Sequence, residues 1–337
     1  MVEKIVAKVI GKGLVKRKSE DDGDLEIKQN FILDDLVDIF REKMSEVIFQ
    51  ELEVKGGYEF EIVLKTKQLS KKGYKNQLEG DFMEVPAMFD LSSKVALVSG
   101  ASRGIGAATA KILAEFGAHV ILTSRKAENL EEVQAQIKNA GKQASAIVCH
   151  NGDLAQIKSL FEKIRESHGR LDILVNNAAT NPFYGSVLEA DEQAWNKTLE
   201  VNLKGPFFMS QYAAGLMRKN DGGSIVNVSS INGRIPMVNQ SIYSITKAAL
   251  ISMTQAFAKE LGGDNIRVNA LLPGLTDTKF ASALTRNDEL MQQVLRQIPL
   301  GRIAQPSEMS GMVLFLVSNA ASYITGSTFT VDGGMLA

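Results

Sequence analysis

The segment "SGASRGIG", Ser99 to Gly106, lies between the β-rich run "KVALVS" and the helical run "AATAKILAEFG". Its glycines have separate uses: Gly100 allows a tight turn, Gly104 lets backbone amides approach a phosphate, and Gly106 lets the helix pack closely. The N-terminus of the following helix attracts negative charge. Glycines alone are weak evidence, but a strand before them and a helix after them predict a phosphate site at this turn.

Short β-rich runs alternate with amphipathic segments from Lys94 onward. Strands joined in this way by helices favour a parallel sheet covered on both faces, the doubly wound α/β architecture of the Rossmann type. Such a sheet binds a dinucleotide at the carboxyl ends of its strands. The seven predicted strands are "KVALVS", "HVILTS", "ASAIVC", "LDILVN", "SIVNVS", "IRVNAL" and "STFTVD".

Residues 1–85 predict a separate small α+β module of unknown function. They carry 15 Lys and Arg against 18 Asp and Glu, a net charge of -3, and the remainder has 23 against 21, a net charge of +2. The runs "KIVAKVIGKGLVKRK" and "YEFEIVLKTKQL" alternate like strands with one face in water. A polar linker, with a boundary between Gln68 and Met88, separates this module from a second domain over residues 89–337.

Residues 34–52 of the module predict an amphipathic helix. Asp34 or Asp35 is a suitable N-cap. The apolar positions that share a helical spacing are Leu36, Ile39, Phe40 and Met44. We expect this module to be an interaction module or an artificial fusion partner.

Composition excludes several classes of partner. The formal net charge is -1, so bulk charge gives no support for binding to nucleic acid or to a membrane. Cys149 is the single cysteine, which suits a reducing compartment. No run approaches about 18 apolar residues, and no His, Cys and Asp grouping has metal-ligand spacing. Since "GGMLA" lacks an SKL-like peroxisomal signal, we expect a cytoplasmic protein without a metal.

The end of the second predicted strand indicates the cofactor. NAD sites usually have a carboxylate about 20 positions after the glycine motif. Here the segment "LTSRK" has Ser124 in that place, followed by Arg125 and Lys126. A carboxylate would repel a 2′-phosphate, whereas a serine and a guanidinium would hold one. Because Arg103 in the glycine loop can approach the same phosphate, the sequence favours NADP.

The segment "YSITK" places Tyr243 four residues before Lys247. On a helix these positions share a face one turn apart, so the phenolic oxygen and the ammonium can point into one pocket. Taken alone, this spacing is weak evidence, because it often marks only a solvated helix face.

Residues 89–337 resemble the short-chain dehydrogenase/reductases. The motifs that carry the resemblance are the glycine turn, "NNAA" (Asn176 to Ala179), "YSITK" and "PG" (Pro273, Gly274), in that order. The segments "VCHNGD", "NNAATNPFYG" and "ASYITG" are most similar to NADPH-dependent carbonyl and retinol reductases. The resemblance implies reduction of ketones or aldehydes to alcohols by a homotetramer, or failing that a homodimer. We expect the "MVLFLV" helix and the segment from Thr246 to Leu261 to form the subunit contacts.

The resemblance also implies catalytic roles. Tyr243 would donate the proton in reduction and accept it as phenolate in oxidation, and Lys247 would favour that phenolate and bind the nicotinamide ribose. Ser230 would donate to the carbonyl oxygen, whereas Ser229 should face away. Asn202 would hold a water that links Lys247 to solvent; the alternative is a helix residue bonded to the backbone.

The expected cofactor-binding residues come from every motif of the second domain. They are Gly100, Ser102, Arg103, Gly104, Ile105, Gly106, Ser124, Arg125, Lys126, Asn177, Ala178, Tyr243, Lys247, Pro273, Gly274, Thr276 and Thr278. His150 stands where many relatives place an aspartate that meets the adenine, and we interpret it as a packed or adenine-flanking residue. We expect an apolar substrate pocket near Phe183, Pro236, Met237 and Phe280.

Two other functions fit the same motifs. The 3-oxoacyl-carrier-protein reductases share all of them, and acyl-carrier thioesters tested beside free diketones would separate the two activities. A dinucleotide sensor without turnover is the other alternative, but it would not need Ser230, Tyr243, Lys247 and Asn202 together.

Overall fold

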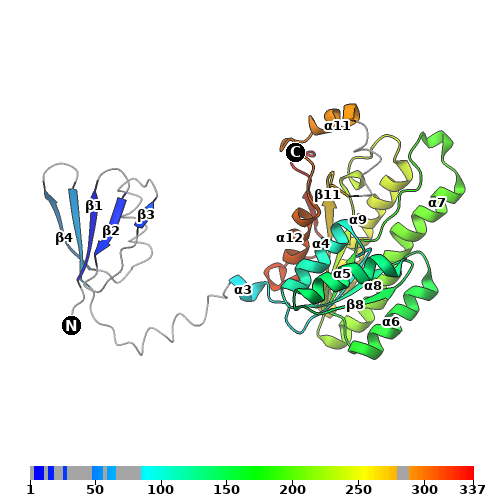
Figure 1. The fold of residues 1–337 in the computed structure, drawn as a ribbon, viewed down its shortest axis with the longest axis horizontal. Coiled ribbons are helices and arrows are strands. Elements are labelled where there is room, and N and C mark those ends of the chain that lie inside the picture. The colour runs from blue at the N-terminus through cyan, green and yellow to red at the C-terminus, as the bar shows by residue number, and fades with distance from the viewer. Residues whose placement is uncertain are drawn as a thin grey trace. The chain divides into compact units, whose positions relative to one another are not determined.

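The computed structural model describes five strands between residues 4 and 65, the continuous stretch 85–278 and residues 288–337, with side chains described for 87–278 and 291–337. The chain divides into two compact units, Met1–Phe82 and Met83–Ala337 (Figure 1).

The first unit contains a five-stranded antiparallel sheet in the order β3-β2-β1-β5-β4. Apolar and charged residues alternate along the sequence of these strands, a pattern typical of a sheet with one face in water. The strands are β1 (Lys4–Ile10), β2 (Leu14–Lys18), β3 (Glu26–Lys28), β4 (Ile48–Lys55) and β5 (Glu59–Lys65).

The predicted helix over residues 34–52 is wrong at its end. Residues 48–52 belong to β4, which pairs with β5 from Ile48 opposite Lys65. Isoleucine and phenylalanine fit a pleated strand well, and pairing with a neighbouring strand outweighs helical spacing in so short a run. Residues 34–47 lie outside the described residues.

The second unit is built on a seven-stranded sheet whose paired strands are all parallel, in the order β12-β11-β10-β9-β6-β7-β8. This confirms the predicted Rossmann-type fold. From β6 the chain moves outward through β7 and β8, then returns to β9 and moves out on the other side. The strand order therefore reverses between β6 and β9, which is where such sheets bind ligands. The strands are β6 (Val95–Ser99), β7 (His119–Ser124), β8 (Ala144–Val148), β9 (Ile173–Asn176), β10 (Gly223–Val228), β11 (Ile266–Pro273) and β12 (Thr328–Val331).

Helices cover both faces of this sheet (Figure 1). One core cluster joins β6 and β7 to α4 (Gly104–Glu115), α5 (Ala127–Asn139) and α12 (Pro306–Val317). The other joins the opposite face to α6 (Leu154–His168), α8 (Gly205–Met217) and α9 (Ser241–Leu261). The remaining helices are α3 (Val85–Met88), α7 (Glu192–Leu199), a π-helix (Glu200–Lys204), α11 (Asp288–Leu295) and 3-10 turns at Val187–Glu189, Arg218–Asn220, Ile231–Gly233, Gly262–Asp264 and Asn319–Ala321.

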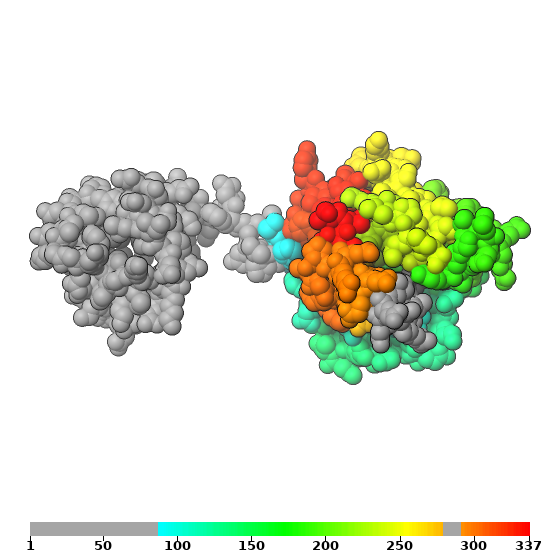
Figure 2. All heavy atoms as spheres, turned by 90° about the horizontal axis from the view of Figure 1, so that it is seen from above, coloured from blue at the N-terminus to red at the C-terminus, as the bar shows by residue number. Residues whose placement is uncertain are grey.

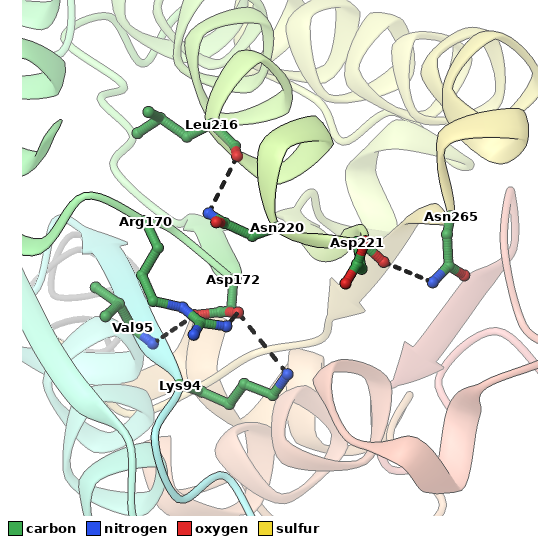
Figure 3. Close-up of polar contacts among 8 residues, drawn as sticks. All are labelled: Lys94, Val95, Arg170, Asp172, Leu216, Asn220, Asp221 and Asn265. Atoms are coloured by element: carbon green, nitrogen blue, oxygen red, sulfur yellow. Dashed lines mark hydrogen bonds and ion pairs between the residues drawn. The ribbon is translucent and has the colours of Figure 1, made fainter.

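A buried aspartate ties three strands together at the amino edge of the sheet (Figure 3). Asp172, 4% exposed, accepts the backbone N–H of Val95 over 2.9 Å and two hydrogen bonds from Arg170 over 3.0 and 2.6 Å. Its carbonyl oxygen accepts the N–H of Ser224. These bonds compensate the cost of burying the carboxylate, and removing them would leave an unpaired charge. They fix β6, β9 and β10 at the edge opposite the glycine turn.

The segment after α11 returns to the C-terminal residues, and Figure 2 shows the two in contact on one side of the second unit. The backbone N–H of Leu300 donates to the carbonyl oxygen of Gly333 over 3.1 Å. The chain end therefore packs against the segment that follows α11.

Candidate functional site

The glycine turn is held against the loop that follows β9. Gly100 has a φ of +66°, in the left-handed region that glycine favours. A Cβ at Gly106 would collide with the carbonyl oxygen of Gly100, so α4 packs as closely as the glycine permits. The side-chain nitrogen of Asn177 donates to the carbonyl oxygens of Ser99 and Gly100 over 2.9 and 3.2 Å. This places the two loops at the strand-order reversal in direct contact.

Ser99 makes the second half of this contact and is absent from the predicted site. Its Oγ accepts the backbone N–H groups of Asn177 and Ala178 over 3.0 and 3.1 Å and donates to the carbonyl oxygen of Val175. Its place in the sequence could have identified it as a site residue, because it ends β6 and begins the glycine motif. The side chain of Ser99 therefore connects the glycine turn to the loop after β9.

The first turn of α4 is open to an anion. Arg103 is the N-cap residue and forms no side-chain capping bond. Ser102 and Ile105 are half-buried beside it, and Gly104 begins the helix with a φ of +56°. Backbone N–H groups at an uncapped helix start, together with the helix dipole, form a phosphate site.

Exposed positive charge surrounds the end of β7. The side chains of Arg103 and Arg125 are exposed, and neither forms an ion pair within the described residues. Ser124 Oγ donates to the carbonyl oxygen of Lys126 over 3.3 Å. An exposed guanidinium directly after a serine suits a phosphate better than it suits ribose hydroxyls, and Arg103 in the glycine loop adds a second positive charge.

His150 packs beside this positive region. Its Nδ1 accepts the N–H of Gly152 over 3.0 Å, and Nε2 lies 3.0 Å from Nζ of Lys197. Burial, followed by the charges of Lys197 and Arg125, lowers the pKa of His150. These contacts hold the ring in place, in agreement with a packed residue.

Tyr243 and Ser230 meet at the carboxyl edge of the sheet. Ser230 follows β10, and Tyr243 is in the first turn of α9. Burial raises the pKa of Tyr243 to about 12, and a hydrogen bond with Ser230 opposes the shift. The direction differs from the expectation that Lys247 makes the phenolate easier to form, because desolvation outweighs the other influences on the phenol. Tyr243 is therefore a neutral acid near neutral pH.

Lys247 is buried one turn below Tyr243. Its Nζ donates to the carbonyl oxygen of Val228 over 2.7 Å and lies 5.5 Å from the centroid of the Tyr243 ring. Burial lowers the pKa of Lys247 to about 7. Ser229 also contacts α9, since its Oγ donates to the Lys247 carbonyl oxygen over 2.8 Å. Ser229 thus holds the helix rather than the substrate.

Asn202 lies in the π-helix and is fully buried. Its amide nitrogen donates to the carbonyl oxygen of Thr180 and to Oγ1 of Thr246, and its amide oxygen accepts the N–H of Thr180. Both donor hydrogens of the side chain are used within the protein. The side chain therefore fixes the loop after β9 to α9, as in the alternative interpretation of a residue bonded to the backbone.

The "PG" segment closes the site after β11. A Cβ at Gly274 would lie 2.6 Å from Cα of Asp332, and Oγ1 of Thr276 donates to the Gly274 carbonyl oxygen over 3.1 Å. Thr278 approaches the glycine turn, since a Cβ at Gly104 would lie 3.1 Å from its methyl group. Pro273 ends β11. Phe280 lies outside the described residues.

Within the described residues, no group of three or more His, Cys, Asp and Glu side chains could hold a metal ion. No helix in the same part of the chain has the length and apolar character needed to cross a membrane.

The fold and the glycine turn define a dinucleotide-binding protein of the Rossmann type. A family model described as enoyl-(acyl carrier protein) reductase matches residues 100–336. The chain is 41% identical over 244 residues to human dehydrogenase/reductase SDR family member 4, covering 72% of this chain and 88% of that protein. It is 39% identical over 246 residues to the 3-oxoacyl-[acyl-carrier-protein] reductase FabG of Thermotoga maritima, covering 73% and 99%.

Among solved structures, a gluconate 5-dehydrogenase from Burkholderia cenocepacia in complex with NADP and tartrate is similar, with a TM-score of 0.73 and 28% identity over 75% of this chain and 99% of that chain. The chain belongs to the short-chain dehydrogenase/reductase family and is an oxidoreductase.

The buried lysine predicts a pH-dependent stability. In the folded protein the pKa of Lys247 is about 7, against 10.5 for an ordinary lysine, so between these values the unfolded chain binds more protons. Raising the pH from about 7 to about 9 should therefore increase the free energy of unfolding, by at most about 1.4 kcal/mol per pH unit. Lys247→Met should lose this increase in urea unfolding, whereas Lys259→Met, an exposed lysine of α9, should keep it. Equal slopes in wild type and Lys247→Met would contradict the assignment.

Proposed function

We propose that the protein reduces ketones and aldehydes to alcohols with NADPH, and that residues 89–337 form the catalytic domain. The observation that carries the proposal is a buried, neutral Tyr243 in hydrogen-bond contact with Ser230 at the carboxyl edge of the sheet. Reduction needs a proton donor at the carbonyl oxygen, and a phenol whose pKa is about 12 is such a donor at neutral pH.

Two side chains act on the carbonyl oxygen. Ser230 donates a hydrogen bond to it, and Tyr243 gives up its proton as negative charge develops there. The cofactor, when bound, supplies the hydride to the carbonyl carbon. The ammonium of Lys247, 5.5 Å from the Tyr243 ring, stabilises the phenolate that remains. In the reverse direction the phenolate is the base, so oxidation is favoured only as the pH rises.

The proposed cofactor is NADPH. The uncapped start of α4 suits its pyrophosphate, and the exposed Arg103 and Arg125 suit its 2′-phosphate. The similar gluconate 5-dehydrogenase was solved with NADP. Asn177 and Ala178 on one side, and the Pro273–Thr278 segment on the other, would border the nicotinamide half.

Exposed apolar side chains near the site support a substrate with apolar groups. Two segments contribute them, and the N–H of Gly185 joins these segments by donating to the carbonyl oxygen of Asn239 over 3.1 Å. Phe183 and Met237 are half-buried in the same segments, and Pro236 is exposed. The exposed large apolar residues here are Tyr184, Val187, Leu188, Ile235 and Val238, of which Leu188 is 93% exposed. Side chains of this kind outside a core commonly mark a binding surface.

Reduction of 3-oxoacyl-carrier-protein thioesters is the second candidate. It is favoured by the similarity to the Thermotoga maritima reductase, of which this chain covers 99%. The two substrates differ in whether the ketone is attached through a thioester to an acyl carrier protein, so a comparison of free ketones with acyl-carrier thioesters separates the two activities.

We propose a homotetramer, with a homodimer as the alternative. The expected contact through the "MVLFLV" helix is limited to Met312 and Phe315, which are partly exposed; the other four residues of this run, Val313, Leu314, Leu316 and Val317, are buried within the subunit. Partly exposed Phe207 and Ile245, on α8 and α9, are better candidates for subunit contacts. Light scattering at micromolar protein should give a multiple of the chain mass, with or without residues 1–85. A monomer mass would contradict both assemblies.

Tyr243→Phe should abolish turnover while NADPH binding stays nearly unchanged, because the ring still packs and only the proton is lost. We expect kcat for apolar ketones to fall by about 10²- to 10⁴-fold. Tyr212→Phe, on α8, is the matched control and should retain wild-type kcat. A Tyr243→Phe enzyme that keeps more than about a tenth of the wild-type kcat would exclude tyrosine as the acid.

Ser124→Asp with Arg125→Ala should reverse the cofactor preference. Wild type should favour NADPH about ten- to hundredfold, the value of a charge-assisted hydrogen bond to phosphate. The new carboxylate would repel the 2′-phosphate and accept hydrogen bonds from the ribose hydroxyls of NADH. Because Arg103 remains, we expect the switch to be incomplete. The measurement is kcat/KM for both cofactors at one ionic strength, with Arg165→Ala on α6 as control; a wild-type preference for NADH would overturn the proposal.

A further inference from the structure

Three amide side chains near the turn that follows Ser230 are joined by hydrogen bonds. The Oε1 atom of Gln240 accepts from Nδ2 of Asn181 and from Nδ2 of Asn232, over 3.4 Å in each case. Asn181 belongs to the loop after β9, Asn232 to the 3-10 turn after β10, and Gln240 is the N-cap residue of α9. Gln240 and Asn232 are buried, at 7% and 5% exposed. One buried amide thus contacts all three segments that surround the candidate site.

Asn232 carries this connection to the serine. Its backbone N–H donates to Oγ of Ser230 over 3.1 Å, and Ser230 in turn forms a hydrogen bond with Tyr243. A hydroxyl whose oxygen already accepts an N–H keeps its own hydrogen for donation. The position of the Asn232 backbone therefore sets the direction in which Ser230 donates.

The backbone of Gln240 is itself fixed to α9. Its carbonyl oxygen accepts the N–H of Ser244 over 2.9 Å and the Ser244 hydroxyl over 2.8 Å, and its N–H donates to Met237 over 3.2 Å. The turn that carries Asn232 also has little room to move, since a Cβ at Gly233 would lie 2.8 Å from the carbonyl oxygen of Lys247. The turn therefore packs directly against α9.

The orientation of the Gln240 amide follows from its neighbours. Its oxygen faces two amide nitrogens, and its nitrogen lies 3.9 Å from Sδ of Met237, a weak acceptor. The oxygen rather than the nitrogen makes the contacts that join the three segments. A side chain that keeps this oxygen should keep the connection.

We propose that Gln240 is a positioning residue for the reaction, which holds Ser230 in its donating geometry through Asn232. This inference rests on the proposed reductase function. Gln240 does not touch the reacting atoms; it determines where the oxyanion donor points. Its loss should therefore lower kcat and leave the binding of NADPH unchanged.

Two substitutions at this position separate positioning from simple packing. Gln240→Met has nearly the same shape and loses the amide oxygen. Gln240→Glu keeps oxygens that accept from Asn181 and Asn232. We expect Gln240→Met to lower kcat about ten- to hundredfold, as for a displaced oxyanion donor. We expect Gln240→Glu to restore most of this loss.

The matched control is Gln143→Met, an exposed glutamine before β8 at the opposite edge of the sheet, which should behave as wild type. Steady-state kcat and KM for one apolar ketone and NADPH affinity by fluorescence would be measured on all full-length variants. A Gln240→Met enzyme with the kcat of the control, or an equal loss in Gln240→Met and Gln240→Glu, would overturn the inference. A wild-type chain without reductase activity would instead overturn the proposed function.

Discussion

The side chains of Ser99 and Asn177 join the two loops at which the strand order of the sheet reverses. Without these hydrogen bonds the glycine turn and the loop after β9 would be separate surface segments, each free to move. With them, the glycine turn and the loop after β9 are joined at the carboxyl edge of the sheet, where Ser230 and Tyr243 also lie. The opposite edge is fixed in the same manner by the buried Asp172. Both sets of hydrogen bonds act on β6 and β9, the two strands between which the strand order reverses.

Placing Lys247 in the interior of this site costs free energy of folding. A fully desolvated ammonium is unfavourable, and its pKa of about 7 expresses that cost. A hydrophobic residue would pack there at lower cost, because the bond to Val228 alone does not replace the lost hydration of the ammonium. The position gains instead a cation 5.5 Å from the Tyr243 ring, which in the proposed reaction stabilises the phenolate. Stability and catalysis therefore make opposite demands on this residue.

The sequence predicts the second unit well, because each parallel strand is buried on both faces and reads as a short apolar run between turns. It predicts β4 poorly, because residues 48–52 continue a helical spacing and only pairing with β5 makes them a strand. The motifs identify Tyr243, Ser230 and the glycines, yet they cannot show which partners a side chain meets across the fold. Hence only the tertiary structure shows three features of the site and core. Asn202 binds Thr180, Val313 is buried in the subunit core, and the pKa of Tyr243 is raised.

The catalytic candidates and the apolar groups near them lie on different kinds of segment. Tyr243 and Lys247 belong to a long helix, whereas the apolar groups near the site come from the segments 183–188 and 235–238. Such segments tolerate sequence change, because few of their backbone groups are buried. In the proposed reaction they also have to leave the position of Ser230 unchanged, because its hydroxyl donates to the carbonyl oxygen. Gln240 lies between the helix that carries Tyr243 and the segments that vary. It is the N-cap residue of α9, and its side chain contacts the turn after β10 and the loop after β9. Under the proposed role, this buried amide keeps Ser230 in place while the sequences of the segments 183–188 and 235–238 vary.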